Sequence, residues 1–416
     1  MISNPFTSDT FSTIWSKHFS QSLSATHFSS LNNLRFEKHK FLPLYFNYGK
    51  THTKGISYDF VNSNIAEIKG KVLLIYDVPT YFRINNEFKP KSLKLHKIKQ
   101  YPGFLIELES FKDLNEYLAN TFNKSSRYKL KKYKNKLEAC FDVNYKMFYG
   151  EMLKSEYDFI FEAFNNLLTK RFNDKQESNN NLEKQEWDFY YEVAYPMILE
   201  KKAGLFVIYN GSQPIGVTLN YFSEDILFDA ITVFDIDYAK FHLGSITIMK
   251  LIEWSIQQNI KIFDFSKGYF DYKKRWATKE YDFEYHIYHD PSSISSKAVA
   301  ILLKNFFRAK QFLRDKKVNE KLHQLTFWLR NKSNKNKSSL QYEFSNVEQG
   351  FKKEELTEVD LKSKDNDFLK PIIFDFLYLN NESFKNLKIH RVIDDNSLFI
   401  IQRKPNNVNS ALRILN

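Results

Sequence analysis

The sequence predicts a mixed α/β fold, in which a mixed sheet is flanked by helices. Residues 225–235 and 261–266 are short apolar segments typical of buried strands, and the stretch between them has apolar residues at helical spacing. A strand, a helix and a second strand in this order predict two parallel neighbours in one sheet. Residues 205–221 add a hairpin, because Asn210-Gly211 suits a tight turn between two apolar runs.

Residues 1–119 are expected to form an N-terminal α/β half. Residues 10–28 begin with aromatic and apolar side chains at helical spacing, which predicts an amphipathic helix. Short apolar runs at 71–76, 93–98 and 104–108 are bounded by prolines and predict strands.

Residues 120–290 are expected to form a second α/β domain around the hairpin and the strand–helix–strand unit. The pattern predicts helices at 110–122, 124–138, 155–172 and up to Glu200, and strands at 141–149 and 282–288. The helix at 124–138 is strongly basic. The basic residues are interpreted either as a solvent-exposed helix face or as a surface that binds phosphate groups. Together with Tyr128 and Tyr133 they could also bind single-stranded RNA by charge and stacking.

The rest of the chain divides into three parts. Residues 291–330 are expected to form a basic helical segment. A helix that packs on the protein and exposes its other face to solvent is favoured over a helix that lies on an anionic membrane. Residues 331–339 are a polar linker, and residues 340–416 are a small α+β module. Within the module we expect a helix at 371–379 and strands at 387–392 and 397–403.

Composition limits the partners. The net charge of +12 and the pI near 9.2 favour anionic partners such as phosphorylated cofactors, nucleotide sugars, RNA or a membrane face. A single cysteine, Cys140, permits no internal disulfide, so a cytoplasmic location is expected, possibly at the inner face of the membrane. No spacing of His or Cys suits a metal, so no metal is expected.

The turn at 242–245 is the first candidate site. A helix begins at Gly244 or Ser245, and the free N–H groups and positive dipole end of a helix N-terminus attract phosphate. We expect the N–H groups of Gly244, Ser245 and Ile246 to receive an anion. The plain alternative is a helix start with a turn glycine.

Several motifs carry a family resemblance. In order they are Leu243-Gly244, Glu253-Trp254-Ser255, Asp264-Phe265, and Gly268 followed by Tyr272-Lys273-Lys274-Arg275-Trp276. Together they resemble the CelD-type branch of the GNAT superfamily of N-acyltransferases, which is related to the FemAB aminoacyl transferases. The resemblance covers residues 120–289 and implies a GNAT-like mixed sheet, with two GNAT-like halves and a C-terminal extension. Phe241 and Ile246 depart from the usual acetyl-CoA loop, which leaves the acyl donor open.

The resemblance implies transfer of an acyl group from acetyl-CoA or another acyl-CoA to an amine. The expected acceptor is an anionic small molecule, such as a nucleotide-linked amino sugar used for cell-surface polysaccharide. Two alternatives stay open: a FemAB-like transferase dependent on aminoacyl-tRNA, and a binding protein without catalysis. Only the first alternative involves tRNA, and no DNA is expected.

Site residues follow from these readings. Asp264, Tyr272 and Asp229 are the candidate catalytic residues, because carboxylates in apolar strands have raised pKa values and a tyrosine is an acid. The CoA is expected to contact Val233, Phe234, Asp235, His242, Leu243, Gly244, Ser245 and Ile246. The acceptor is expected to contact Lys273, Arg275, Trp276 and Arg127.

Overall fold

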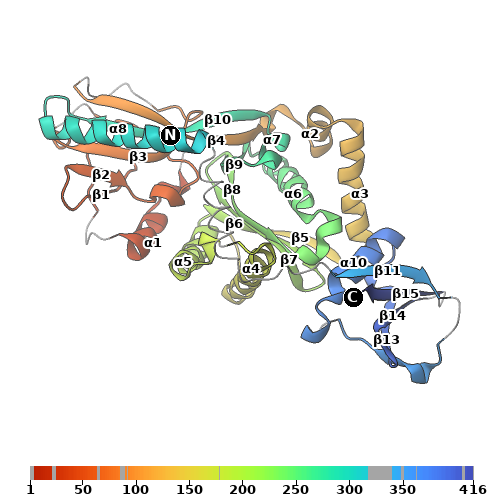
Figure 1. Ribbon diagram of the computed structural model, residues 1–416. Helices are drawn as coiled ribbons and strands as arrows, with labels where there is room; N and C mark the ends of the chain where they lie inside the picture. The colour runs from red at the N-terminus through yellow and green to blue at the C-terminus, as the bar shows by residue number, and fades with distance from the viewer. Residues whose placement is uncertain are drawn as a thin grey trace.

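The computed structural model describes residues 4–20, 25–62, 66–84, 90, 92–177, 179–316, 340–347, 351–361, 363–404 and 408–415. One mixed sheet of ten strands runs through the molecule in the order β1-β2-β3-β10-β4-β9-β8-β7-β6-β5 (Figure 1). The strands are β1 Phe36–Lys38, β2 Leu44–Asn47, β3 Val72–Pro79, β4 Lys94–Glu107, β5 Val143–Phe148, β6 Ala203–Asn210, β7 Gln213–Phe222, β8 Ile226–Phe234, β9 Ile262–Lys267 and β10 Lys279–His289. The pairs β2/β3 and β8/β9 are parallel and the others are antiparallel.

Helices cover both faces of this sheet, which confirms the predicted fold class (Figure 1). The helices are α1 Asp9–Phe19, α2 Leu114–Thr121, α3 Lys124–Cys140, α4 Lys154–Lys175, α5 Lys184–Leu199, α6 Leu243–Gln257, α7 Asp271–Trp276 and α8 Ile294–Asp315. Helices α1, α4 and α5 pack into the core on one face, while α2, α3 and α6 pack into the core on the other. Helix α8 covers β3, β4 and β10 at the N-terminal end of the sheet. None of the described helices has the length and apolar character that a membrane span needs.

The two halves of the protein share the sheet. Strand β10 comes from the end of the second half, yet it pairs with β3 and β4 of the first half. Strand β4 then pairs with β9, which joins the halves edge to edge. Residues 279–289 therefore complete the sheet of the N-terminal half.

Three elements differ from the predictions. The two strands expected at 93–98 and 104–108 are one strand, β4, which runs through Pro102-Gly103. Gly103 makes this possible, because a Cβ there would lie 2.2 Å from the Tyr281 ring of β10. The first helix ends at Phe19 instead of extending to residue 28, and the motif from Gly268 to Trp276, for which no helix was predicted, contains the short helix α7.

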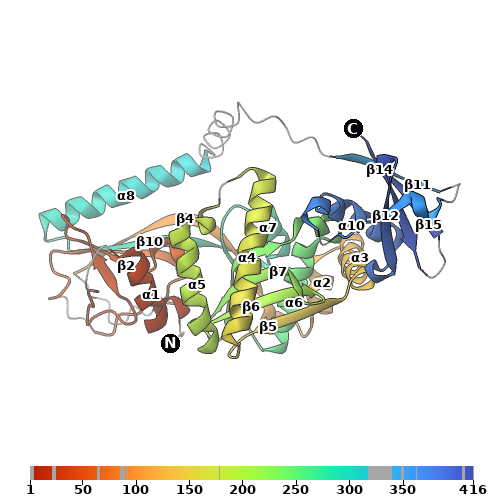
Figure 2. The same cartoon turned by 90° about the horizontal axis from the view of Figure 1, so that it is seen from below.

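The C-terminal module is a five-stranded sheet with one long helix. Its elements are β11 Gln341–Asn346, β12 Leu356–Glu358, α10 Leu369–Asn380, β13 Leu387–Val392, β14 Asp395–Arg403 and β15 Val408–Leu415. The predicted helix and both predicted strands correspond to α10, β13 and β14. Figure 2 shows this module at the opposite end of the molecule from α8. The predicted linker at 331–339 lies outside the described residues, as does the expected helix beyond residue 316.

The module shares a core with the second half. Phe374 of α10 packs against Phe141, with ring centroids 4.9 Å apart, and against Tyr238, with centroids 4.7 Å apart. Tyr378 packs against Phe241 at 5.2 Å. These contacts reach the 3-10 helix at Ile236–Phe241 that leads into α6.

Candidate active site

The parallel strands β8 and β9 separate after three residues. Their register pairs Ile226 with Ile262, Leu227 with Phe263 and Phe228 with Asp264, and no pairing continues beyond Phe228 among the described residues. Strand β8 goes on along β7, whereas β9 goes on along β4. The edge of β8 that faces β9 is therefore open from Asp229 onward, and its backbone groups are available to an extended ligand.

A cavity of about 370 Å³ occupies this opening. It lies between β8, the start of α6 and α7, with one wall from α4. The lining residues are Arg171, Asp229, Thr232, Phe234, Ala239, His242, Leu243, Gly244, Ser245, Thr247, Ile248, Leu251, Tyr272, Arg275 and Trp276. Two of the three predicted catalytic residues are thus brought together with the predicted turn.

The residue in the left-handed conformation before α6 is His242 and not the turn glycine. His242, with φ 54° and ψ 50°, makes the turn, and its carbonyl oxygen accepts hydrogen bonds from the N–H groups of Ser245 and Ile246. Two of the three N–H groups expected to bind the anion are therefore engaged already. No hydrogen bond is found in the described residues for the N–H groups of Leu243 and Gly244, so the available anion site lies one residue earlier.

Gly244 is required by packing. A Cβ on this residue would lie 2.9 Å from Cε1 of Phe234, at the end of β8. The absent side chain lets the start of α6 approach the open strand edge closely, which brings the free N–H groups to the mouth of the cavity.

Two arginines supply positive charge at this mouth. Arg171 of α4 lies over the Phe234 ring, 4.6 Å from its centroid, and Arg275 of α7 lies close enough to His242 to lower the pKa of that imidazole further, after burial has lowered it. A neutral His242 packs against Tyr133 of α3, with ring centroids 3.9 Å apart. The arginines and not the histidine therefore provide the charge that a phosphate needs.

Asp229 and Tyr272 both line the cavity, close enough for the charge of Asp229 to act on the Tyr272 hydroxyl. Thr232 donates a hydrogen bond of 2.9 Å to the Asp229 carboxylate, and burial raises the pKa of that carboxyl above its ordinary value. Burial also raises the pKa of the Tyr272 hydroxyl, and the nearby Asp229 adds to that shift. At neutral pH Tyr272 keeps its proton, while Asp229 is a stronger base than an exposed aspartate.

Asp264 lies behind the cavity and does not line it. It is fully buried and accepts hydrogen bonds from Tyr281 at 2.7 Å, from Tyr81 at 2.8 Å and from the Ser266 N–H at 2.7 Å. Burial raises its pKa to about 6, against the opposing effect of these hydrogen bonds. The carboxylate oxygens are occupied by protein groups, so Asp264 holds β9, β10 and the Tyr81 loop together.

Lys273 is buried, although it was expected to hold a substrate anion. Its ammonium group donates to the carbonyl oxygens of Phe265, at 2.6 Å, and Lys267, at 2.9 Å. Burial lowers its pKa to about 8, and the nearby Lys267 lowers it as well, while Asp229 and Asp264 oppose the shift. The side chain thus closes the end of β9, where Ser266 has a positive φ of 60°.

A cluster of charges from the N-terminal half lies next to Asp229. Asp77 accepts a hydrogen bond from Thr53 at 3.0 Å and pairs with Lys267 at 2.6 Å. Beside them, burial lowers the pKa of Lys54 to about 8, and Lys267 and Lys273 lower it further. No ion pair is found for Lys54 in the described part of the chain, which leaves a cation of the first half facing the carboxylate of the second.

The remaining predicted residues have structural contacts. Val233 is buried in the core, and Asp235 pairs with Lys170 of α4 at 2.6 Å. Arg127 donates to the carbonyl oxygens of Ala119 and Phe122, which end α2. Trp276 is buried between the cavity and a core aromatic, Phe122, with ring centroids 4.8 Å apart.

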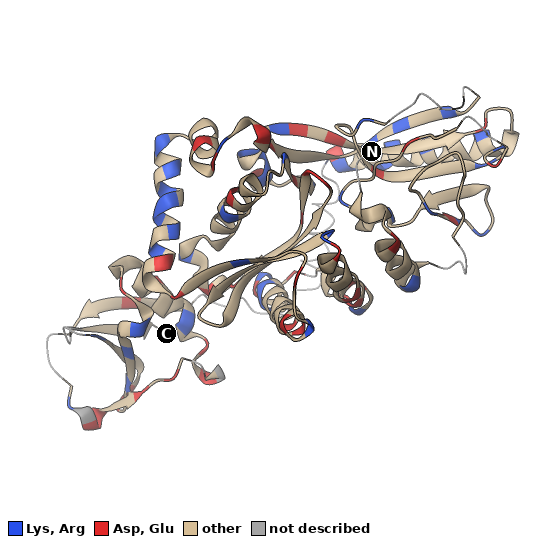
Figure 3. Cartoon of the chain, turned by 180° about the vertical axis from the view of Figure 1, so that it is seen from behind, with Lys and Arg blue, Asp and Glu red and all other residues tan. Residues whose placement is uncertain are grey.

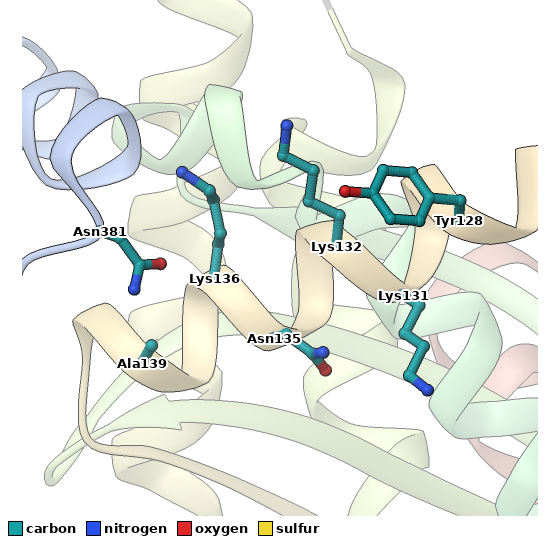
Figure 4. Close-up of a pocket in the computed structure, with 7 residues that line it drawn as sticks. All are labelled: Tyr128, Lys131, Lys132, Asn135, Lys136, Ala139 and Asn381. Atoms are coloured by element: carbon teal, nitrogen blue, oxygen red, sulfur yellow. The ribbon is translucent and has the colours of Figure 1, made fainter. Parts of the chain in front are cut away.

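A second hollow lies along α3, on which basic residues recur along most of the helix (Figure 3). Its lining residues are Tyr128, Lys131, Lys132, Asn135, Lys136, Ala139 and Asn381, and its volume is about 600 Å³ (Figure 4). Figure 4 shows the Lys132 and Lys136 side chains pointing to the same side of the helix. Lys136 is held by the Tyr378 carbonyl oxygen, whereas Tyr128 is largely exposed.

Sequence reasoning missed Arg171, Thr232, Lys54 and Tyr81 as parts of the site. Arg171 lies within α4 and Lys54 lies in an irregular segment. Neither position has a local signal, because Arg171 reaches the cavity and Lys54 reaches the neighbourhood of Asp229 only through tertiary packing. No group of three or more His, Cys, Asp or Glu side chains suited to a metal occurs within the described residues.

Residues 124–274 match the family model of an acetyltransferase (GNAT) domain. No curated protein matches the chain. Solved structures with a similar chain path include a conserved protein of unknown function from Bacteroides thetaiotaomicron, at 9% identity over 68% of this chain and 90% of that chain with a TM-score of 0.44. They also include FemX, at 12% identity over 61% and 83% with a TM-score of 0.43. A third is a tandem GNAT protein from the clavulanic acid biosynthesis pathway, at 8% identity over 61% and 77% with a TM-score of 0.32.

The separated strands, the helix start at their mouth and the family match together define an N-acyltransferase. Residues 124–274 therefore form a GNAT acetyltransferase domain, the family that the motifs from Leu243 to Trp276 predicted.

Proposed function

We propose that this protein transfers an acyl group, in the simplest case acetyl, from acyl-CoA to the amine of an anionic small molecule. A nucleotide-linked amino sugar used for cell-surface polysaccharide is the acceptor that we favour. The observation that carries the proposal is the cavity beside the open edge of β8. Its lining combines the start of α6, where the N–H groups of Leu243 and Gly244 have no partner among the described residues, with Arg171, Arg275, Asp229 and Tyr272.

The acyl donor fits this arrangement from end to end. The pyrophosphate of CoA accepts hydrogen bonds from the N–H groups of Leu243 and Gly244, with Arg171 and Arg275 beside it. The pantetheine arm lies along the open edge of β8 and pairs with its backbone. The thioester then reaches the inner end of the cavity, near Asp229 and Tyr272.

The chemistry requires one proton to leave the amine and one to reach the sulfur. Asp229 accepts a proton from the acceptor ammonium group, and the free amine attacks the thioester carbonyl carbon. As the tetrahedral intermediate collapses, the C–S bond breaks and Tyr272 donates its hydroxyl proton to the leaving CoA sulfur. The tyrosine recovers a proton from the nitrogen of the intermediate, which becomes the neutral amide nitrogen, so that the products are the amide, CoA thiol and the proton held by Asp229. Asp229 is favoured over Asp264 as the base because only Asp229 lines the cavity.

An anionic acceptor is favoured by the charges opposite the CoA site. Lys54 faces Asp229 from the N-terminal half, and it has no ion-pair partner among the described residues. A phosphate or carboxylate of the acceptor bound to Lys54 would hold the amine near Asp229. This geometry uses both halves of the sheet, so the acceptor lies between them.

The hollow on α3 favours a second candidate function, transfer from aminoacyl-tRNA. The exposed Tyr128 and the lysines beside it suit a nucleic acid backbone with stacked bases. Helix α3 also contacts the mouth of the cavity, through Tyr133 and His242. A charged tRNA bound on α3 would therefore approach the same turn.

Titration calorimetry with CoA, acetyl-CoA and charged tRNA separates the two candidates. We expect CoA to bind the parent protein and Arg275→Gln to weaken it by about 1 to 3 kcal/mol, since a charge-assisted contact to phosphate is lost. Lys274→Gln is the matched control, because Lys274 is exposed, adjacent and outside the cavity lining. Absence of CoA binding, with binding of charged tRNA, would contradict the CoA assignment and support the second candidate.

A further inference from the structure

Helix α8 packs Val299, Ala300 and Phe307 against the sheet, and near its C-terminus it also buries two polar side chains there. Toward the protein it presents Gln311 and Arg314, which are buried together with Phe307. Arg314 lies over the ring of Tyr101 of β4 at 3.6 Å, and Gln311 donates to Asp315. The second half of the helix therefore uses polar side chains to attach to the sheet.

Toward solvent the same helix presents large apolar side chains. Leu302 is 68% exposed, Phe306 is 60% exposed and Leu313 is 49% exposed. Spacings of four and seven residues place these three on one stripe. The exposed Ile294, Ile301 and Phe312 lie about a quarter turn around the helix from this stripe and widen the exposed apolar face. Figure 2 shows α8 along the outer edge of the molecule, without another labelled element on its outer side.

The exposed apolar side chains differ from the sequence-based expectation of a packed helix whose outer face is polar and exposed to solvent. The packed face exists, since Phe307 stacks on Tyr285 of β10 with ring centroids 3.9 Å apart. The opposite face, however, exposes large apolar side chains to solvent. A continuous exposed apolar stripe of this kind marks a surface that contacts another apolar phase or molecule.

The charges on α8 indicate what kind of surface the exposed apolar side chains contact. Between Ile294 and Asp315 the helix carries five basic residues, Lys297, Lys304, Arg308, Lys310 and Arg314, against one acidic residue. Lys297 and Arg308 are exposed next to the side of the apolar face that Ile294 and Ile301 form. An apolar stripe flanked by cations is complementary to the surface of a bilayer with anionic headgroups, where the stripe enters the acyl boundary and the cations remain at the phosphates.

We propose that α8 docks the protein on the surface of an anionic lipid bilayer, with Leu302, Phe306 and Leu313 inserted. The helix lies in the plane of the membrane and does not cross it. This inference is independent of the acyl donor, because it rests on the outer face of α8 and on no residue of the cavity.

Co-sedimentation of the full chain with lipid vesicles tests the proposal. We expect binding to vesicles of phosphatidylcholine with one part in three phosphatidylglycerol, and much weaker binding to phosphatidylcholine alone. Leu302→Ser with Phe306→Ser should weaken binding to the anionic vesicles by at least about tenfold, because two inserted side chains are lost. Lys297→Gln with Arg308→Gln should weaken it by about fivefold for each charge and reduce its salt dependence.

The matched control is Leu153→Ser with Leu379→Ser, which removes two similarly exposed apolar side chains, one from the residue before α4 and one from α10. This control should bind vesicles like the parent protein, and circular dichroism should show all variants folded. Unchanged vesicle binding by Leu302→Ser with Phe306→Ser would overturn the proposal. So would failure of the parent to bind anionic vesicles, or conversion of a dimer to a monomer by that same double variant in sedimentation velocity, since a second copy would then cover the stripe.

Discussion

Replacing Asp264 with asparagine provides a quantitative test of the site. Asp264 is fully buried, and its pKa rises from 3.8 to about 6 in the folded protein. Between these two pH values the folded protein holds the proton and the unfolded chain has released it. The carboxyl group therefore stabilises the fold at low pH, and this contribution is lost as the pH rises through about 6. A shift of this size corresponds to about 3 kcal/mol of pH-dependent unfolding free energy.

The asparagine variant does not titrate, so the comparison isolates this one group. We expect the unfolding free energy of the parent, minus that of Asp264→Asn, to decrease by about 3 kcal/mol from below pH 4 to above pH 6. Urea denaturation followed by tryptophan fluorescence at several pH values measures this difference. Contributions from other titrating groups cancel in the difference, provided that they are the same in both proteins.

Activity supplies the second half of this test. Asp264 accepts hydrogen bonds from Tyr81, Tyr281 and Ser266 and does not line the cavity. We therefore expect Asp264→Asn to change kcat/KM for the acetyl acceptor by less than about tenfold at pH 8, well below the range of a lost general base. A free-energy difference that is constant with pH, or a variant that is folded but inactive, would refute the assignment of Asp264 as a structural carboxyl.

Asp229→Asn should lower kcat/KM by about 10²- to 10⁴-fold and remove the acidic limb of the pH–rate profile, in which the rate rises as this carboxyl loses its proton. Full activity in a folded variant would exclude Asp229 as the base. Gly244→Ala should destabilise the fold by about 1 to 3 kcal/mol and weaken CoA in calorimetry, because its Cβ meets Phe234 at 2.9 Å, and Phe234→Leu in the same chain should restore part of both losses. Lys273→Met should cost about 1 to 3 kcal/mol in urea denaturation, since buried carbonyl groups lose their hydrogen-bond partner; a loss of turnover without a loss of stability would return Lys273 to the acceptor site. Deletion of residues 340–416 should lower the melting temperature, because α10 shares a core with the turn before α6, and an unchanged melting temperature would show that the module is independent.

The sequence determined the elements whose signals are local. The hairpin at 205–221 follows from Asn210-Gly211 between two apolar runs, and the structure forms it as β6 and β7. The order of β8, α6 and β9 follows from hydrophobic periodicity, which also placed a helix start beside the end of a strand. These features need only neighbouring residues, so a single sequence contains them.

The tertiary structure alone decided which side chains reach the cavity. Arg171 lines the cavity because α4 packs across the end of β8. Lys273 does not line it, because its ammonium group donates to carbonyl oxygens at the end of β9. Asp264 and Asp229 are both carboxylates in apolar strands, and no local pattern distinguishes them. Their roles differ because β9 continues along β4, whereas β8 separates from β9. Asp264 on β9 is therefore buried between tyrosines, and Asp229 on β8 lies at an open strand edge. Such contacts join residues far apart along the chain, and hydrophobic periodicity contains no information about them.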